Sequence, residues 1–158
     1  MRPLIGDWIF GCDICQDVCP VNRKAQKPRQ PIQKTAAIRS TGNLDLSELL
    51  ELTEEEFRTR FRGTSIMRAK RVGLQKNACV AMGNNRNTDG VPALISALIN
   101  PEPLVRGHAA WALGNIATEE AFSTLEEASE SEMDPYVIEE IQGALKAAGV
   151  KRPASQTS

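Results

Sequence analysis

Small and apolar residues in the second half of the chain recur with a period of 31 residues. The stretch from Leu74 to Asn84, LQKNACVAMGN, aligns with the stretch from Val105 to Asn115, VRGHAAWALGN. The matching positions are Ala78, Ala81, Gly83 and Asn84 in the first stretch, and Ala109, Ala112, Gly114 and Asn115 in the second. Alanines three residues apart lie on one face of a helix and let a neighbouring helix approach closely. The period therefore predicts stacked pairs of antiparallel helices.

A third, shorter copy of the pattern follows as VIEEIQGALKA, in which Ala144 takes the place of the alanines. Pro103 and Pro135 stand two residues before the aligned valines, where the fixed φ of proline suits a first helical turn. The second helix of each pair is expected from Val91 and after Thr118, a typical N-cap residue. The pattern resembles short HEAT-like repeats. We expect an α-solenoid over residues 66–149, with these alanines buried at the helix contacts: Ala78, Ala81, Ala109, Ala112 and Ala144.

Residues 45–65 are expected to form a short helical connector ahead of the repeats. The segments LDLSELLEL and TEEEFRTRF each read as one helix. Thr53 and Glu56 have the spacing of a capping box, and Gly63 is expected to end the second helix. Phe57 and Phe61 fall on one helix face, which is typical of core packing. The polar residues 150–158 are expected to be a frayed tail.

Three of the four cysteines lie in the run GCDICQDVCP. Cys12, Cys15 and Cys19, followed by Pro20, reproduce the last three positions of the bacterial ferredoxin run C-x2-C-x2-C-x3-C-P. In this alignment Cys12 and Cys15 bind one [4Fe-4S] cluster and Cys19 binds a second. Zinc is the alternative metal, with His108 as the only histidine in the chain. The proline favours iron and sulfur, because a structural zinc site does not need it.

The fourth cysteine, Cys79, stands inside the repeat pattern, where we expect a small buried hydrophobic residue. Before the cysteine run, Trp8, Ile9 and Phe10 either shield a cluster or belong to the core, and the sequence leaves both readings open. No apolar run approaches the roughly 20 residues of a membrane-spanning helix, and the N-terminus lacks the pattern of a signal peptide. We therefore expect a cytoplasmic protein with no membrane partner, in which clustered cysteines bind metal rather than form disulfides.

The net charge of −1 hides an uneven distribution of charge along the chain. Residues 18–44 contain six cations and no acid, and residues 57–88 contain eight cations and no acid. The acidic residues gather at 45–56 and 119–140. This asymmetry predicts one surface that faces a polyanion and an opposite acidic surface. The expected phosphate-binding ridge pairs two residues of the short second helix with two of the first repeat helix, each pair on one helix face: Arg58, Arg62, Arg68 and Arg71.

Several segments, taken in order, resemble the C-terminal part of tRNA epoxyqueuosine reductases, a family that uses cobalamin and two [4Fe-4S] clusters and carries HEAT-like C-terminal repeats. They are RPLIGDWIFGCDICQDVCPVN, FRTRFRGT and RAKRVGLQKNACVAMGN. The similarity runs from about Arg2 to Ala148. Val21 departs from it, since the family is expected to have tryptophan after the C-P pair.

The resemblance implies that the protein reduces epoxyqueuosine to queuosine at the wobble position of tRNA. Its fold would be mainly α: half of a ferredoxin-like double [4Fe-4S] segment at residues 1–22, a basic linker at 23–44, then the connector and the repeats. The basic ridge would meet tRNA. Cobalamin and the remaining cluster ligands would belong to a missing N-terminal domain before Met1, so that the chain would be a fragment, inactive alone.

Two other functions stay open from the sequence. One is a non-catalytic HEAT-like scaffold for protein interaction with a small zinc site. The other is an electron-carrying subunit whose missing cluster ligands come from a separate chain. Zinc content without visible absorbance would favour the first, and a partner carrying the other cysteine run would favour the second.

Overall fold

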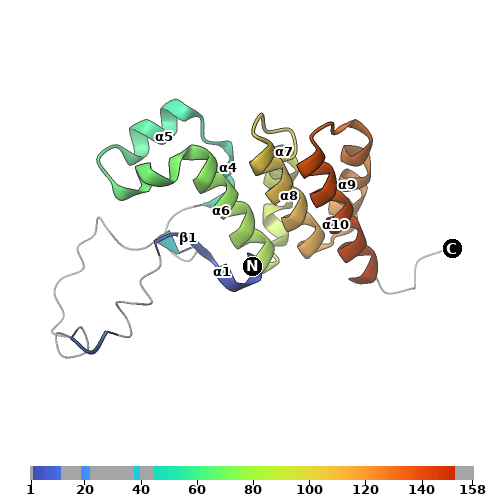
Figure 1. The fold of residues 1–158 in the computed structure, drawn as a ribbon, viewed down its shortest axis with the longest axis horizontal. Helices are drawn as coiled ribbons and strands as arrows, with labels where there is room; N and C mark the ends of the chain where they lie inside the picture. The colour runs from blue at the N-terminus through green and yellow to red at the C-terminus, as the bar shows by residue number, and fades with distance from the viewer. Residues whose placement is uncertain (1, 12–18, 22–37, 40–44, 152–158) are drawn as a thin grey trace.

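The computed structural model describes residues 2–11, 19–21, 38–39 and 45–151 (Figure 1). In this part of the chain helices predominate, as the sequence predicts. The elements before the repeats are α1 (Arg2–Ile5), β1 (Trp8–Phe10), β2 (Ile38–Arg39), α4 (Leu46–Glu51), α5 (Glu54–Phe61) and the 3₁₀ helix η1 (Ser65–Ala69). The elements of the repeats are α6 (Lys70–Asn85), the 3₁₀ helix η2 (Thr88–Gly90), α7 (Val91–Ala97), α8 (Pro103–Ile116), α9 (Glu119–Ser131) and α10 (Pro135–Lys151). None of the described helices is long and apolar enough to cross a membrane.

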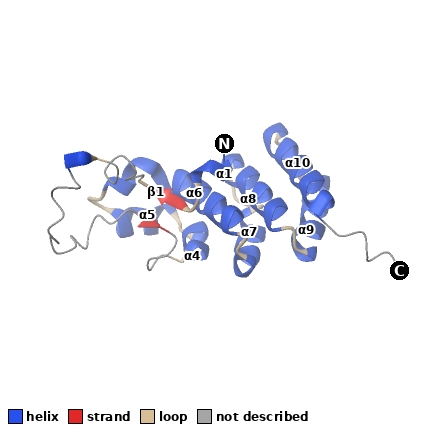
Figure 2. Cartoon of the chain, turned by 90° about the horizontal axis from the view of Figure 1, so that it is seen from below, coloured by secondary structure: helices blue, strands red, loops and turns tan. Residues whose placement is uncertain are grey.

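The repeats stack as two layers of helices (Figure 2). Helices α6, α8 and α10 pack side by side in one layer, and α7 and α9 lie in the other. Helix α4 contacts both α6 and α7, so it extends the second layer by one helix. The segment that the sequence marks as a connector therefore also contributes to the repeat array. Helix α10 reaches Lys151, two residues beyond the expected end of the repeats.

The small residues of the repeat pattern lie where neighbouring helices touch. Four of the five predicted alanines are 0% exposed and Ala144 is 4% exposed, which confirms their predicted burial. Gly83 and Gly114 of the pattern also lie at these close helix contacts. A Cβ on Gly83 would lie 2.9 Å from the Cα of Ala112, and a Cβ on Gly114 would lie 2.6 Å from the Cβ of Ala144. The pattern A-x-G-N thus reflects helices that approach too closely for any larger side chain.

The predicted helix boundaries before and within the repeats are largely observed. The Thr53 hydroxyl accepts a hydrogen bond from the Glu56 amide at 3.2 Å, and the Glu56 carboxylate accepts one from the Thr53 amide at 2.8 Å, which completes the capping box. Thr118 caps α9. Phe57 and Phe61 are buried, with ring centroids 5.3 Å apart, as expected for core residues.

The N-terminal segment contributes a short two-stranded sheet that the sequence did not predict. Strand β1 pairs antiparallel with β2, with Trp8 opposite Arg39 and Phe10 opposite Ile38. Two residues of the segment expected as a linker are therefore paired. Ile9 is fully buried against α6, which supports the reading of this aromatic segment as core.

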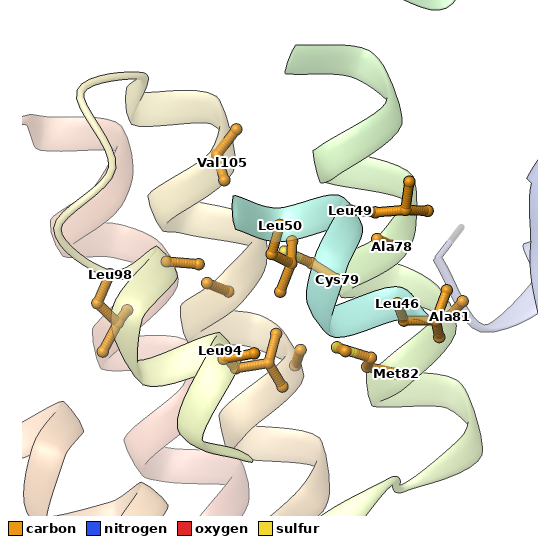
Figure 3. Close-up of a cluster of buried hydrophobic side chains, with 14 of the residues drawn as sticks. Leu46, Leu49, Leu50, Ala78, Cys79, Ala81, Met82, Leu94, Leu98 and Val105 are labelled. Atoms are coloured by element: carbon orange, nitrogen blue, oxygen red, sulfur yellow. The ribbon is translucent and has the colours of Figure 1, made fainter. Parts of the chain in front are cut away.

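Cys79 belongs to the hydrophobic core, as the sequence predicts. Its side chain is fully buried and lies beside Leu50 of α4 and the neighbouring residues of α6 (Figure 3). Burial raises the pKa of its thiol to about 12. A neutral, enclosed thiol is a poor metal ligand, because metals bind the thiolate.

Arg106 and Glu132 form an ion pair that ties the start of α8 to the end of α9. Arg106 Nε lies 2.7 Å from Glu132 Oε2, and their side chains are 16% and 11% exposed. Glu132 also accepts hydrogen bonds from the amides of Met133 and Asp134 at 3.0 and 2.9 Å. These donors, Arg106 foremost, lower the pKa of the Glu132 carboxyl from its ordinary value of 4.5 to about 2.

We expect Glu132→Gln to reduce the free energy of unfolding by about 2 kcal/mol at pH 7. Because the pKa of Glu132 is lower in the folded state, its contribution is fully present above pH 4.5 and disappears as the pH falls toward 2. Urea denaturation across this range should show the wild-type and variant curves converging. Glu130→Gln, an exposed position in the last turn of α9, is the control and should change little. A difference between Glu132→Gln and wild type that does not vary with pH would contradict the assignment.

Candidate nucleic-acid interface

A basic cavity of about 630 Å³ lies where α5, the turn after it and the start of α6 meet. Four cations line it: Arg58, Arg62, Lys70 and Arg71. The first turn of α6 faces the cavity and contains no acidic residue, and its N-cap residue, Ala69, offers no side-chain acceptor. The positive end of the helix dipole therefore adds to the charge of the side chains. We refer to these four cations and the space between them as the basic cavity.

Two of the four cations share one acidic partner. Arg58 Nε lies 2.9 Å from Glu54 Oε1, and Arg71 Nε lies 3.6 Å from Glu54 Oε2. Arg71 is the least exposed of the four, with 16% of its side chain accessible, and its Nη1 donates to Gln75 Oε1 at 2.8 Å. Its Nε lacks a hydrogen-bond acceptor among the described residues, since the distance to Glu54 is too long for one. Glu54 therefore offsets only part of the charge.

The other two cations are available to an anion. Arg62 and Lys70 are exposed, and neither forms an ion pair with any residue in the described part of the chain. With Glu54 and Glu102 as the acids beside four cations, the lining keeps an excess of positive charge. Such a cavity suits a phosphate group more than a neutral ligand.

Three of the four residues of the predicted ridge lie together. Arg58, Arg62 and Arg71 converge on the basic cavity, but Arg68 does not line it. The expected common helix face of Arg68 and Arg71 is wrong: Arg68 lies in η1, and the chain turns at Lys70, the first residue of α6, which has a φ of 59°. Sequence analysis missed Lys70 as a member, although it stands in the same acid-free stretch.

The acidic and basic stretches are less separate in space than along the sequence. Glu48 lies 3.3 Å from Arg60, and Glu54 pairs with Arg58 one helical turn further on. Glu54 of this acidic stretch therefore lines the basic cavity rather than lying opposite it, because α5 carries both Glu54 and Arg58. The acidic region at 119–140 lies in α9 and α10, at the far end of the array (Figure 1).

His108 is a satisfied core residue. It is 8% exposed, and its Nδ1 lies 2.9 Å from the Leu104 carbonyl oxygen and 3.2 Å from the Tyr136 hydroxyl. Since a carbonyl only accepts hydrogen bonds, Nδ1 carries the proton. Burial, and next the charge of Arg2, lower the pKa of its imidazole.

The predicted cluster ligands fall mostly outside the described residues. Cys12 and Cys15 lie there, while Cys19 is described, partly exposed and not in a disulfide. No three residues of the types His, Cys, Asp and Glu gather as a metal site within the described ranges. The ligand set therefore stays a prediction from the sequence.

Known proteins resemble this chain first of all over its stacked helices. The family model for HEAT repeats matches residues 64–146. The chain belongs to the HEAT-repeat family. The stacked helices α6–α10 are these HEAT repeats, and their start at the 3₁₀ helix η1 places the basic cavity at the first of them.

The similarity to curated relatives extends beyond the HEAT repeats. The chain is 31% identical over 152 residues to the epoxyqueuosine reductase of Bacillus cereus, covering 96% of this chain and 40% of that protein. It is 40% identical over 114 residues to the epoxyqueuosine reductase of Pseudomonas aeruginosa, covering 72% of this chain and 31% of the relative. The chain thus spans about two fifths of the length of the Bacillus relative. The resemblance identified from the sequence is confirmed.

Solved structures show the same architecture. A crystal structure of epoxyqueuosine reductase with an epoxyqueuosine-modified tRNA-Tyr stem loop superposes with a TM-score of 0.82 at 30% identity, covering 94% of this chain and 39% of that one. A selenomethionine-labelled epoxyqueuosine reductase gives a TM-score of 0.80 at 30% identity, covering 93% and 39%. The arrangement of the HEAT repeats and the segments before them is therefore shared with these reductases.

Proposed function

We propose that this chain supplies cluster ligands and tRNA-docking HEAT repeats to an epoxyqueuosine reductase, an oxidoreductase that converts epoxyqueuosine to queuosine at the tRNA wobble position. The observation that carries the proposal is the similarity to epoxyqueuosine reductases over 96% of the chain, the cysteine run included. A relative solved with a tRNA stem loop supports tRNA as the partner. Because the chain spans about two fifths of the Bacillus relative, the remaining functions would come from the rest of the enzyme.

The cysteines would hold the iron. The spacing of Cys12, Cys15 and Cys19 suits [4Fe-4S] ligation, and thiolates are the donors that such clusters use. Cys79 is excluded because its thiol is buried and neutral. When bound, the clusters would supply single electrons, and cobalamin would be held by the rest of the enzyme. The protein's own part is to hold the ligands in place and to shield them from water.

The cations would hold the RNA. Arg58, Arg62, Lys70 and Arg71 would neutralise backbone phosphates at the basic cavity, and Arg68 would make a further phosphate contact outside it. Contacts of this kind dominate the affinity for nucleic acids but carry no sequence information. Recognition would therefore rest on the shape of the folded tRNA rather than on bases.

The test compares the chain alone with a hybrid enzyme. After anaerobic reconstitution, the isolated chain should bind well under the roughly eight irons of two [4Fe-4S] clusters and should not reduce epoxyqueuosine, because three cysteines are too few. Joined to the remaining part of the Bacillus cereus relative, it should bind about eight irons and act on epoxyqueuosine-containing tRNA. Cys19→Ala in the hybrid should lower the iron content.

Two results would contradict the proposal. One is a hybrid that binds iron but leaves epoxyqueuosine unchanged in tRNA. The other is an isolated chain that binds one zinc tightly and shows no visible absorbance after reconstitution with iron and sulfide, which would favour the zinc-containing scaffold.

A further inference from the structure

Two asparagines of α6 hold the N-terminal segment, residues 2–11, by its backbone carbonyls. Asn77 Nδ2 donates to the carbonyl of Ile9 at 2.7 Å. Asn84 Nδ2 donates to the carbonyls of Arg2 at 3.0 Å and Gly6 at 2.6 Å. Asn84 lies seven positions after Asn77, which is about two helical turns, so both project from one face of α6.

Arg2, at the start of the segment, reaches α10, which lies at the other end of the layer formed by α6, α8 and α10. Arg2 Nη1 donates to Glu140 Oε2 of α10 at 2.7 Å, and Nη2 lies 3.4 Å from the Tyr136 hydroxyl. The guanidinium also lies 5.3 Å from the ring centroid of Trp111 on α8. The hydrogen bond to Glu140 raises the pKa of Arg2. Residues 2–11 thus contact α6, α8 and α10, and α1 lies against this layer in both views (Figures 1 and 2).

The segment has little structure that could persist without these contacts. Helix α1 is four residues long, β1 is three, and a turn at Gly6, with a φ of 63°, separates them. A single helical turn and an isolated short strand pair are unstable in water. Contacts with the rest of the protein therefore order it, and the hydrogen bonds with Asn77, Asn84 and Glu140 contribute together with burial of Ile9 and the pairing of β1 with β2.

We infer that Asn77 and Asn84 are positioning residues: they fix residues 2–11 on the HEAT repeats, so that the cysteine run, which begins directly after this segment, starts from an anchored point. The HEAT repeats would then carry the iron–sulfur segment as well as the RNA. The anchoring itself depends only on the described contacts. Its consequence for the clusters rests on the proposed function.

Hydrogen exchange on the full chain, without iron, tests the anchoring. In Asn77→Ala/Asn84→Ala, backbone amides of residues 2–11 should exchange at least about tenfold faster than in wild type, while peptides from α9 should be unchanged. Gln75→Ala is the matched control. Gln75 lies on the same helix and donates in the same way, but to the Leu50 carbonyl at 2.7 Å, so its loss should expose α4 and not the N-terminal segment.

A second variant covers the case in which the double variant fails to fold. Glu140→Gln, a partly exposed position, weakens the bond to Arg2 and should speed exchange at residues 2–6 in a folded protein. Unchanged protection of residues 2–11 in whichever of these variants fold would overturn the anchoring.

A measurement in the iron-loaded hybrid separates this inference from the proposed function. Asn77→Ala/Asn84→Ala should shift the cluster reduction potentials or the electron paramagnetic resonance signals and leave tRNA affinity unchanged. Identical potentials and spectra, in a variant whose segment is released, would overturn the positioning role. A wild-type hybrid that binds no iron would contradict the proposed function instead, and the exchange experiment would still decide the anchoring.

Discussion

Gly114→Ala should destabilise the protein by about 3 kcal/mol, at the upper end of the range for overpacked cores. The reason is the contact between α8 and α10, where an added Cβ would lie 2.6 Å from the Cβ of Ala144 and 2.7 Å from its Cα. Backbone atoms cannot move aside as a flexible side chain can, so the two helices must separate along their whole contact. Chemical denaturation followed by circular dichroism measures the effect.

Gly143→Ala is the matched control on α10. A Cβ there meets nothing within 4 Å. Because alanine restricts the unfolded chain more than glycine and favours a helix, this substitution should stabilise the protein by about 0.5 to 1 kcal/mol. Similar effects at both glycines would show that α8 and α10 do not approach as closely as the structure indicates, and that the repeat pattern has another cause.

Arg62→Gln/Lys70→Gln should weaken binding to a tRNA anticodon stem loop by about tenfold at moderate salt and lower the salt slope by about 1.5, the loss of two phosphate contacts. Both side chains are exposed and have no ion pair within the described residues, so their replacement should not affect folding. The loss should be similar for stem loops of different sequence, because phosphate contacts do not read bases. Fluorescence anisotropy over a range of salt concentrations on the full chain measures both quantities.

The control for this binding experiment removes two positive charges outside the basic cavity. Arg86→Gln/Lys146→Gln also replaces two exposed cations without ion pairs in the described part of the chain, but neither lines the basic cavity. Equal losses in the two double variants would show that only net charge matters and that the cavity is not a binding site. Arg68→Gln adds a separate comparison: a loss as large as that of Arg62→Gln would extend the binding surface beyond the cavity.

The basic cavity shows why the site could be predicted only in part. The acid-free stretch at 57–88 contains all four cations that line the cavity. The prediction named one wrong cation, because it assumed one continuous helix from Arg68 to Arg71. Since the chain turns at Lys70, Lys70 lines the cavity and Arg68 does not. The partner Glu54 was assigned to an opposing acidic face, because charge along a sequence does not reveal which helices pack together.

Features that depend on neighbours along the chain could be predicted from the amino-acid sequence. The period of 31 residues determined the stacked helices, the Thr53–Glu56 spacing determined a cap, and the alanines determined the helix contacts, because residues three and four apart share a face of any helix. The cysteine run and the segments after it were enough to indicate the reductase family.

Contacts between segments far apart in the sequence became visible in the folded structure. It placed α4 in the second layer of helices, brought Glu54 to Arg71, and joined Asn77 to Ile9 across 68 residues and Arg2 to Glu140 across 138. An asparagine within a repeat pattern is an ordinary polar position until the fold brings a carbonyl within reach of its amide. Such pairings are fixed by the packing of whole helices, and no local periodicity encodes them.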